Sequence, residues 1–327
     1  MTISFCIPTL NRADFLVKTL KSICSDQSYS SQFEICIYNN FSNSSYLDVE
    51  NEIEELSKEF NIKYKKGTSR VEIDQSMFEA ISPAVGEYLF LIGDDDYLKE
   101  GGLKEIFNLI KEEEFDLSVF NALRVTDNSA DEVQLIGFYD KKYSDFDTAL
   151  LELKEYCTYG NLLVKREYIK HDDFKYLFGT SHAYGCFWLS FFRKYEQNVI
   201  PKIIVPKESV VCLRYMEKNY DLMEVTFRHS DLEHKLFFNV IGEKSKKLLA
   251  KFESRINKRF STVRFFVDLG ISNNDLGRIK SINLDFYRKN KIKIFFSKIL
   301  VKLIMTFKKQ IKLLLKINFF HNLVYKK

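Results

Sequence analysis

The chain has 327 residues and a mass of 38.6 kDa, enough for roughly two domains with a sizeable core. Hydrophobic residues make up 46% of it and charged residues 29%, with only 12 glycines and 4 prolines, which excludes a largely disordered, collagen-like or linker-dominated protein. The six cysteines lack metal-ligand spacing and several lie in apolar runs, so we expect reduced core residues and exclude a disulfide-stapled miniprotein.

The net charge of +4 is distributed unevenly along the chain. Ten lysines and no other charged residue lie between Lys291 and Lys327, so this tail carries +10 and residues 1–290 carry −6. A uniformly basic nucleic-acid-binding domain is therefore excluded, whereas an enzyme with a basic anchoring segment fits. The first strand runs straight into Pro8 without a basic region or a long apolar stretch, so we expect no secretory signal and no export.

Short apolar runs alternate with helical patterns along the first 120 residues. Alternating Ile3, Phe5 and Ile7 predict a strand that Pro8 breaks, and Asn11 is placed to cap the helix that follows. The next elements are expected as a strand at 33–38, a helix at 47–60, a strand at 62–65, a helix at 77–84 and strands at 87–92 and 117–121. After about residue 125 the alternation weakens, with a strand expected at 160–165 and mainly helix at 221–284. This pattern predicts an α/β fold with a mostly parallel sheet, helices on both faces, and ligands beyond the carboxyl ends of the strands.

Three consecutive carboxylates, Asp94 to Asp96, follow the buried strand at 87–92. Carboxylates in such a row repel one another, and their desolvation is costly without a counter-charge. Because oxygen ligands suit Mg²⁺ or Mn²⁺, we expect a divalent cation here, whose shell is completed by phosphate oxygens. The alternative is a solvated acidic turn that caps the helix beginning near Gly101.

Three segments together resemble the family 2 glycosyltransferases of GT-A fold: Ser4 to Arg12, the turn after Ile37, and Gly86 to Asp96. The run from Leu91 to Leu98 is most similar to the abequosyltransferase-like branch, whose members add sugars to bacterial surface polysaccharides. The resemblance covers about the first 110 residues. It implies a GT-A, Rossmann-like sheet. Together with the pattern along the rest of the chain, we expect a nucleotide-sugar-binding half (1–125), an acceptor-side half (126–220), a mainly helical region (221–290) and a basic amphipathic tail (291–327).

The resemblance also implies roles for individual residues. The expected contacts to the nucleotide sugar are made by Pro8, Thr9, Asn11, Arg12, Asn39, Asp74, Asp94 and Arg214. Asn39 stands where the family usually has an Asp that reads the base or ribose, which leaves the base open. Asp95 aligns with the metal-binding position for Mn²⁺ or Mg²⁺, and Asp96 either assists it or caps the next helix.

The general base is less clearly marked, because the Glu-Asp pair common in the family is missing from the region about a hundred residues past the metal motif. His182, in a Gly-flanked segment, is the first candidate, since histidine changes charge near neutral pH. The alternative is a histidine that only satisfies a local hydrogen bond. Asp173 is the second candidate, or else a turn or helix cap. Trp188 either stacks on an acceptor sugar or, as is more usual, belongs to the core.

On a helical projection, the tail places Ile292, Phe295 and Phe296 on one side and lysines opposite. Its apolar stretches are too short to span a bilayer, so we expect contact with an anionic membrane surface; the alternative is a helix docked on the protein's own core.

The sequence therefore predicts a metal-dependent, inverting hexosyl- or deoxyhexosyl-transferase, peripheral on the cytoplasmic face of the cell membrane. It would move one sugar from a nucleotide-sugar donor to a glycan or lipid-linked oligosaccharide, without a nucleic-acid partner. Three alternatives stay open: a catalytically inactive scaffold of the same fold, a nucleic-acid-binding protein using the lysine tail, and a metal-dependent phosphohydrolase.

Overall fold

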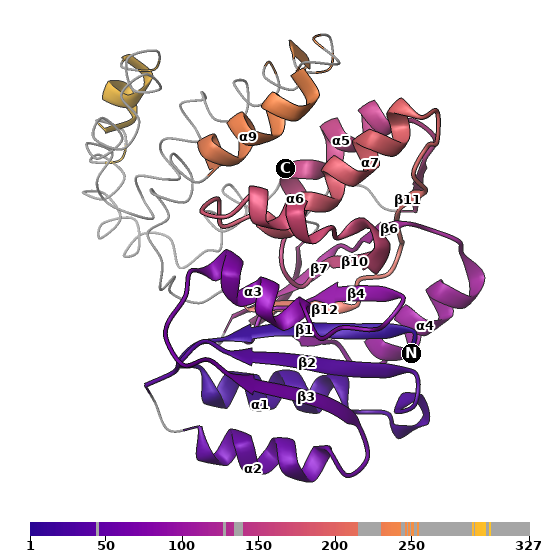
Figure 1. Cartoon of the computed structure of the whole chain (residues 1–327), viewed down its shortest axis with the longest axis vertical. Helices are drawn as coiled ribbons and strands as arrows, with labels where there is room; N and C mark the ends of the chain where they lie inside the picture. The colour runs from indigo at the N-terminus through magenta and orange to yellow at the C-terminus, as the bar shows by residue number, and fades with distance from the viewer. Residues whose placement is uncertain are drawn as a thin grey trace, which may run out of the picture. The chain divides into compact units, whose positions relative to one another are not determined.

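The computed structural model describes residues 1–43, 46–126, 129–133, 140–214, 230–242 and 292–298, and the single positions 246, 248, 250, 251, 254, 290 and 301. Within these residues, strands and helices alternate along the first third of the chain (Figure 1). The strands of the larger sheet are β1 (Ile3–Thr9), β2 (Phe33–Asn39), β3 (Asn61–Lys66), β4 (Tyr88–Leu91), β6 (Leu117–Val119), β9 (Lys141–Tyr143), β10 (Leu162–Lys165) and β11 (Ile203–Val205).

In the described part of the chain this sheet has the order β3-β2-β1-β4-β10-β6-β11-β9. The first four strands are mutually parallel, whereas β10 runs antiparallel to both β4 and β6. The fold is therefore α/β with a mixed sheet, whose first four strands in this order are parallel. Strands β1, β2 and β4 all point their carboxyl ends toward one edge, and this edge carries the polar residues singled out by the sequence.

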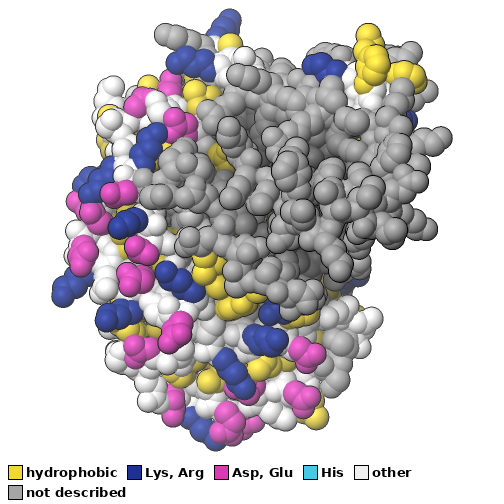
Figure 2. All heavy atoms as spheres, turned by 180° about the vertical axis from the view of Figure 1, so that it is seen from behind, with side chains coloured by type: hydrophobic (Ala, Val, Ile, Leu, Met, Phe, Trp, Pro, Cys, Tyr) yellow, Lys and Arg dark blue, Asp and Glu magenta, His cyan; other side chains and the backbone are white. Residues whose placement is uncertain are grey.

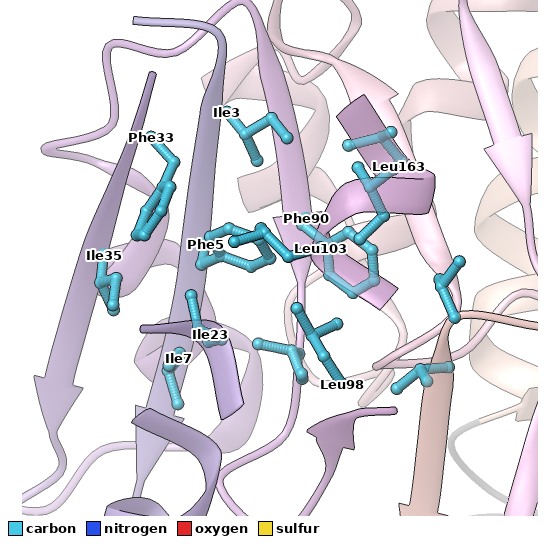
Figure 3. Close-up of a cluster of buried hydrophobic side chains, with 14 of the residues drawn as sticks. Ile3, Phe5, Ile7, Ile23, Phe33, Ile35, Phe90, Leu98, Leu103 and Leu163 are labelled. Atoms are coloured by element: carbon cyan, nitrogen blue, oxygen red, sulfur yellow. The ribbon is translucent and has the colours of Figure 1, made fainter. Parts of the chain in front are cut away.

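One face of the sheet is packed by an apolar cluster (Figure 3). Phe5 of β1 lies 5.6 Å from Phe33 and 5.4 Å from Phe90, measured between ring centroids, so aromatic rings of neighbouring strands contact one another. The helices that cover this face are α1 (Ala13–Ile23), α2 (Leu47–Leu56) and α4 (Gly102–Glu112). Residues at even positions of β1 point the other way and are also buried, so this strand is covered on both faces.

Helix α3 (Ile73–Ile81) packs against β1 and β2. The other helices are α5 (Phe146–Leu153), α6 (His171–Tyr176), α7 (Phe187–Glu196) and α9 (Ser230–Gly242). Trp188 of α7 is 1% exposed and packs among phenylalanine rings, so its assignment to the core is confirmed.

A smaller sheet has the order β5-β12-β7-β8, where the strands are β5 (Tyr97–Leu98), β7 (Ala122–Thr126), β8 (Ser129–Val133) and β12 (Val211–Arg214). Strand β12 pairs antiparallel with β5 and parallel with β7. Because β5 directly follows the aspartate triplet, this sheet brings residues near position 214 to the same place as residues near position 96.

Two local predictions at the start of the chain are wrong. Pro8 does not break the first strand, because β1 pairs with β2 as far as Thr9, while pairing with β4 stops at Cys6 and leaves the proline with a strand on one side only. Asn11 does not cap the first helix: Arg12 is the N-cap residue, and Asn11 takes a left-handed conformation with φ 57°.

Part of the expected C-terminal organisation lies outside the described residues, including most of 221–290 and most of the tail. Residues 292–298 are helical, and their Ile292, Phe295 and Phe296 are 72%, 60% and 58% exposed. In the part of the chain that the structure describes, no helix is both long and apolar enough to cross a membrane. Elsewhere, Figure 2 shows Lys and Arg side chains interspersed with Asp and Glu over the described part of one face.

Candidate active site

The loops that follow β1 and β4 meet through the side chains of Asp94 and Asp95. The Arg12 guanidinium Nη1 donates to Asp94 Oδ1 at 3.0 Å and to Asp95 Oδ2 at 2.8 Å. The backbone N–H of Leu10 also donates to Asp94 Oδ2, at 3.3 Å. Both carboxylates therefore face the loop formed by residues 10–12, as expected from the parallel arrangement of the two strands.

Asp94 is 5% exposed, and the groups around its carboxyl shift its pKa in opposite directions. Burial raises the pKa of Asp94 to about 6, assisted by the negative charge of Asp95 and opposed by Arg12 and by the hydroxyl of Thr9. For Arg12, burial lowers the pKa of the guanidinium, but the attraction of Asp94 and Asp95 is stronger, so its pKa is raised overall. Arg12 is therefore the counter-ion that keeps a buried carboxylate ionised.

Asp96 has a different environment from its two neighbours. It is 7% exposed, and its Oδ1 accepts the backbone N–H of Arg214 at 3.1 Å. Burial and the charge of Asp95 raise the pKa of Asp96 well above its usual value. The alternative that Asp96 caps the next helix is wrong, because α4 begins after Gly101 without a side-chain cap.

Arg214, at the end of β12, packs its guanidinium over the ring of Phe15 at 4.4 Å and near that of Tyr97 at 5.9 Å. Residues 94–96 form a turn that we call the aspartate turn. The structure brings Arg214 to this turn, but the contact is made by the backbone N–H of Arg214. Its role toward donor phosphates stays a prediction.

Sequence reasoning missed Thr19, which holds the aspartate turn, and Tyr46, which holds the loop that faces it. Thr19 Oγ1 lies 3.0 Å from the carbonyl oxygen of Asp94 and 2.6 Å from that of Asp96. The Tyr46 hydroxyl accepts the backbone N–H of Arg12 at 2.9 Å and lies 2.8 Å from Thr9 Oγ1. Thr19 had a detectable signal, since it is a hydroxyl residue on the buried stripe of α1, whereas Tyr46 had none.

The residues near the end of β2 are engaged by the protein itself. The fully buried Asn39 donates to the Tyr64 hydroxyl at 2.9 Å, and its Oδ1 accepts the backbone N–H of Ser42 at 3.0 Å. Asn11 is tied to the same turn, because its backbone N–H donates to Ser42 Oγ and its Oδ1 accepts from Asn43. Asn39 therefore shapes the turn, and its contact to a nucleotide stays a prediction, as do those of Pro8 and Thr9, which are buried in β1.

Asp74, in the first turn of α3, binds the loop that carries His182. Its carboxylate is 1% exposed and accepts the backbone N–H groups of Ser181, at 2.8 Å, and Ala183, at 3.0 Å. Burial raises the pKa of Asp74, and these hydrogen bonds oppose the increase. Asp74 is thus directed at the His182 loop, and its expected contact to the nucleotide sugar is untested.

The His182 ring has a defined tautomer. Its Nδ1 lies 2.7 Å from the carbonyl oxygen of Thr180, and since a carbonyl oxygen can only accept, Nδ1 carries the hydrogen. Nε2 then carries the basic lone pair. The other candidate base, Asp173, is 7% exposed and accepts hydrogen bonds from Nη1 and Nη2 of Arg193 at 2.5 Å, in an ion pair between α6 and α7 whose arginine side chain is 46% exposed. The structure does not bring Asp173 to the aspartate turn.

The segment 157–161 lies between the aspartate turn and the His182 loop. A Cβ on Gly160 would be 3.0 Å from Asp96 Oδ2, and the Gly160 N–H donates to the carbonyl oxygen of Leu91 at 2.6 Å. On the other side, the ring of Tyr159 lies 4.4 Å from that of Tyr184, whose hydroxyl donates to the carbonyl oxygen of Cys157. This segment therefore contacts Asp96 on one side and Tyr184, two residues after His182, on the other.

The aspartate turn has the chemistry of a divalent-cation site of the kind in which the substrate completes the shell. Within the described ranges no three His, Cys, Asp or Glu side chains converge on one point. Asp94 and Asp95, however, already share one cationic group, so their oxygens suit a positive charge at this position. Mg²⁺ and Mn²⁺ commonly take one or two protein carboxylates, with phosphate oxygens as further ligands. A site with only two neighbouring carboxylates, and no third protein ligand, is therefore sufficient for such an ion.

The fold and this site define a class of protein. The model of the glycosyl transferase family 2 matches residues 4–197, and the chain belongs to that family. This confirms the resemblance given by the opening loop and the aspartate triplet.

Individual relatives cover different parts of the chain. The abequosyltransferase RfbV of Salmonella typhimurium is 33% identical over 103 residues, which are 32% of this chain and about a third (31%) of the relative. The crystal structure of S. aureus TarS 1-349 in complex with UDP-GlcNAc has a TM-score of 0.59 at 15% identity, with 94% of this chain and 92% of TarS covered. The structure of TarS 1-349 alone has a TM-score of 0.57 at 14% identity, over 94% and 91% of the two chains. At this identity the TarS similarity establishes a shared fold.

Proposed function

We propose that this protein transfers a single sugar from a nucleotide-sugar donor to a bacterial surface glycan, with Mn²⁺ or Mg²⁺ at the aspartate turn and with inversion at the anomeric carbon. One observation carries the proposal. Asp94 and Asp95, just after β4, face the loop after β1, and both accept a hydrogen bond from the Arg12 guanidinium. Family membership supports the class of reaction, and the complex of TarS with UDP-GlcNAc supports the class of donor.

In this proposal Asp94 binds the ribose and Asp95 binds the metal, with Asp96 behind them fixed by the backbone N–H of Arg214. The bound ion would stabilise the negative charge that develops on the leaving diphosphate. Thr19 holds the turn, because its hydroxyl contacts the carbonyl oxygens of Asp94 and Asp96. The carboxylates would thus be positioned before the donor arrives.

His182 is the proposed general base. The acceptor hydroxyl attacks the anomeric carbon while the bond from that carbon to the diphosphate oxygen breaks, and the hydroxyl proton passes to Nε2 of His182. The nucleoside diphosphate leaves. Two contacts support this role: Thr180 fixes the tautomer, and Asp74 holds the loop on both sides of the histidine through main-chain hydrogen bonds. Asp173 is less suited, because Arg193 already neutralises it.

A lipid-linked acceptor at the inner face of the membrane is the proposed second substrate. The exposure of Ile292, Phe295 and Phe296, next to the exposed Lys293 and Lys298, supports a membrane-contacting tail. RfbV is named as an abequosyltransferase, which supports a deoxyhexosyl or hexosyl donor.

The test is a binding titration of the full chain with UDP-, GDP-, dTDP- and CDP-sugars, with and without Mn²⁺. We expect one nucleotide to bind in a metal-dependent manner, and Asp95→Asn to remove that dependence. Binding without turnover on any lipid-linked glycan would favour the inactive scaffold. Failure of all four nucleotides to bind would contradict the proposed function.

A further inference from the structure

Arg12 occupies the position of a counter-cation at the aspartate turn. A single nitrogen, Nη1, contacts carboxylate oxygens of two different residues, at 3.0 Å for Asp94 and 2.8 Å for Asp95. The side chains of Asp94 and Asp95 are 6% and 20% exposed, so neither charge is fully solvated. Two such carboxylates repel each other, and the guanidinium offsets that repulsion in the unliganded protein.

A divalent ion and the guanidinium compete for the same oxygens. A metal bound to Asp95 would lie close to Oδ2, which Arg12 Nη1 contacts at present. Two positive groups at hydrogen-bond distance from one oxygen repel each other, so metal binding favours movement of the arginine. A metal on this oxygen therefore binds at the expense of the existing ion pair.

The side chain of Arg12 can leave without a change in the loop. Its backbone is held by other contacts: the N–H donates to the Tyr46 hydroxyl at 2.9 Å, and the carbonyl oxygen accepts the N–H of Leu16 at 3.0 Å. The side chain itself is 27% exposed. Rotation of its χ angles is thus enough to move the guanidinium away from the carboxylates.

A diphosphate is the natural new partner for that guanidinium. Arginine presents parallel N–H groups that match phosphate oxygens in a bidentate geometry. The donor diphosphate would bind the metal at the same edge of the sheet, within reach of residue 12. We infer that Arg12 is an exchangeable counter-ion: it neutralises Asp94 and Asp95 in the free protein, is displaced by the divalent ion, and then binds the donor diphosphate.

This inference rests on the proposed function and makes a prediction of its own. Arg12 would weaken the binding of the metal alone and strengthen the binding of the diphosphate in the presence of metal. Because binding free energies are reciprocal, metal and nucleotide should each increase the affinity of the other. A residue with a purely structural role would change both affinities in the same direction.

The experiment measures Mn²⁺ binding to the full chain by electron paramagnetic resonance at pH 8, and then the binding of UDP, GDP, dTDP and CDP by calorimetry at saturating Mn²⁺. We expect Arg12→Gln to bind Mn²⁺ alone about five- to tenfold more tightly than the wild type, because an ion pair no longer competes. The same variant should bind the preferred nucleoside diphosphate about tenfold more weakly. Circular dichroism checks that it folds.

Two further variants serve as controls. Arg12→Lys keeps the charge but not the bidentate geometry, so its Mn²⁺ affinity should stay near the wild-type value while its diphosphate affinity falls. Asp95→Asn should lose Mn²⁺ binding. If Arg12→Gln binds Mn²⁺ no more tightly while Asp95→Asn still loses it, the inference on Arg12 is overturned and the metal site stands. Absence of Mn²⁺ binding in the wild type, with and without nucleotide, overturns the metal site and the inference together.

Discussion

Three aspartates adjacent in sequence acquire different properties from what surrounds each of them. Asp94 is buried against Arg12 and Leu10, Asp95 is partly exposed on the same guanidinium, and Asp96 is buried against a backbone N–H from β12. Three identical side chains are therefore divided into two that face Arg12, of which Asp95 is the more exposed, and one that accepts a backbone N–H. The division comes from tertiary contacts and not from the sequence of the triplet.

The pKa of Asp94 predicts how donor binding depends on pH. Burial raises that pKa to about 6, so the carboxyl becomes neutral below this pH and a weaker acceptor for the ribose hydroxyl that it is proposed to bind. We expect the affinity for the nucleotide sugar to decrease between pH 7.5 and pH 5, by roughly tenfold per pH unit below 6 at the steepest. Calorimetry across this range measures it, and His182→Asn should keep the pH dependence. A constant affinity would contradict the assignment.

The ionisation of Asp94 also changes the free energy of unfolding, which falls as the pH rises, whereas the donor affinity falls as the pH decreases. The folded state holds the Asp94 proton up to about pH 6, whereas the unfolded chain releases it near its ordinary value of about 3.9. Asp94 therefore lowers the free energy of unfolding as the pH rises from about 4 to about 6, and the decrease remains above pH 6. A bound donor and metal would offset this contribution at neutral pH.

A side chain at position 160 should affect both the stability of the fold and the binding of the donor. Its φ is 85°, and a Cβ there would lie 2.6 Å from Leu213 Cδ2 and 3.0 Å from Asp96 Oδ2. Gly160→Ala should cost about 3 kcal/mol, from left-handed strain together with the clash, and should weaken donor binding by moving Asp96. Thermal unfolding and calorimetry measure the two effects.

A matched control for this change is Gly101→Ala. Gly101 has a similar φ of 73°, but a Cβ there would meet nothing within 4 Å. Only the backbone strain of about 1 to 2 kcal/mol should remain, with donor binding unchanged. Equal losses of donor affinity in both variants would show that Gly160 acts through general stability.

At the scale of elements, the contact between α3 and the His182 loop depends on Asp74. Asp74→Ala removes the carboxylate that accepts the buried N–H of Ala183 and the part-buried N–H of Ser181, and should cost about 1 to 3 kcal/mol. The loop would lose its fixed position, so we expect kcat to decrease at least about tenfold while Mn²⁺ affinity changes little. Steady-state kinetics and Mn²⁺ titration separate the two.

Glu79→Gln on the same helix is the control. Glu79 pairs with Lys65, whose side chain is 63% exposed, so its loss should change stability by less than about 1 kcal/mol and leave kcat unchanged. A decrease in Mn²⁺ affinity of Asp74→Ala as large as its decrease in kcat would assign Asp74 to the donor site instead.

The sequence predicted those elements whose signals are local. Alternating apolar residues predict β1 and a continuous apolar run predicts β4, because both strands lie inside the sheet and are buried along their whole length. Helix α3 was expected to begin at Met77 and begins at Ile73, since its buried polar residues Asp74 and Ser76 look like a loop until their tertiary surroundings are known. The antiparallel insertion of β10 between β4 and β6 has no local signal at all.

The candidate site was predictable to the extent that it follows from parallel strands. Asp94 and the loop at Arg12 meet because both follow parallel neighbours, β4 and β1. Tyr46 and Gly160 were missed, because their roles depend on contacts with residues far away in the chain. The ion pair of Asp173 with Arg193 likewise joins two helices, and no spacing rule predicts it.

At the scale of the whole molecule, the tail predicts where the protein works. Deletion of residues 291–327 removes ten lysines and the exposed Ile292, Phe295 and Phe296. With about 1 kcal/mol gained per basic residue near an anionic surface, we expect the deletion to reduce the affinity for phosphatidylglycerol vesicles by more than about a hundredfold. Vesicle sedimentation measures it.

Neutral phosphatidylcholine vesicles and high salt serve as controls, because both should reduce binding of the full chain if charge contributes. Soluble donor binding should be the same with and without the tail. Unchanged sedimentation of the shortened chain on anionic vesicles would show that the anchor lies elsewhere.

The hydrogen bonds from main-chain N–H groups to Asp74 have a consequence for how the acceptor preference of such an enzyme could evolve. Peptide N–H groups are present whatever side chain residue 181 carries, proline excepted, so these two hydrogen bonds do not depend on the Ser181 side chain. Position 183 is different, because Ala183 is fully buried and a larger side chain would have to displace its neighbours. Under the proposed function, position 181 is accordingly where substitutions aimed at new acceptors should be placed, with glycine and asparagine favoured by its φ of 60°.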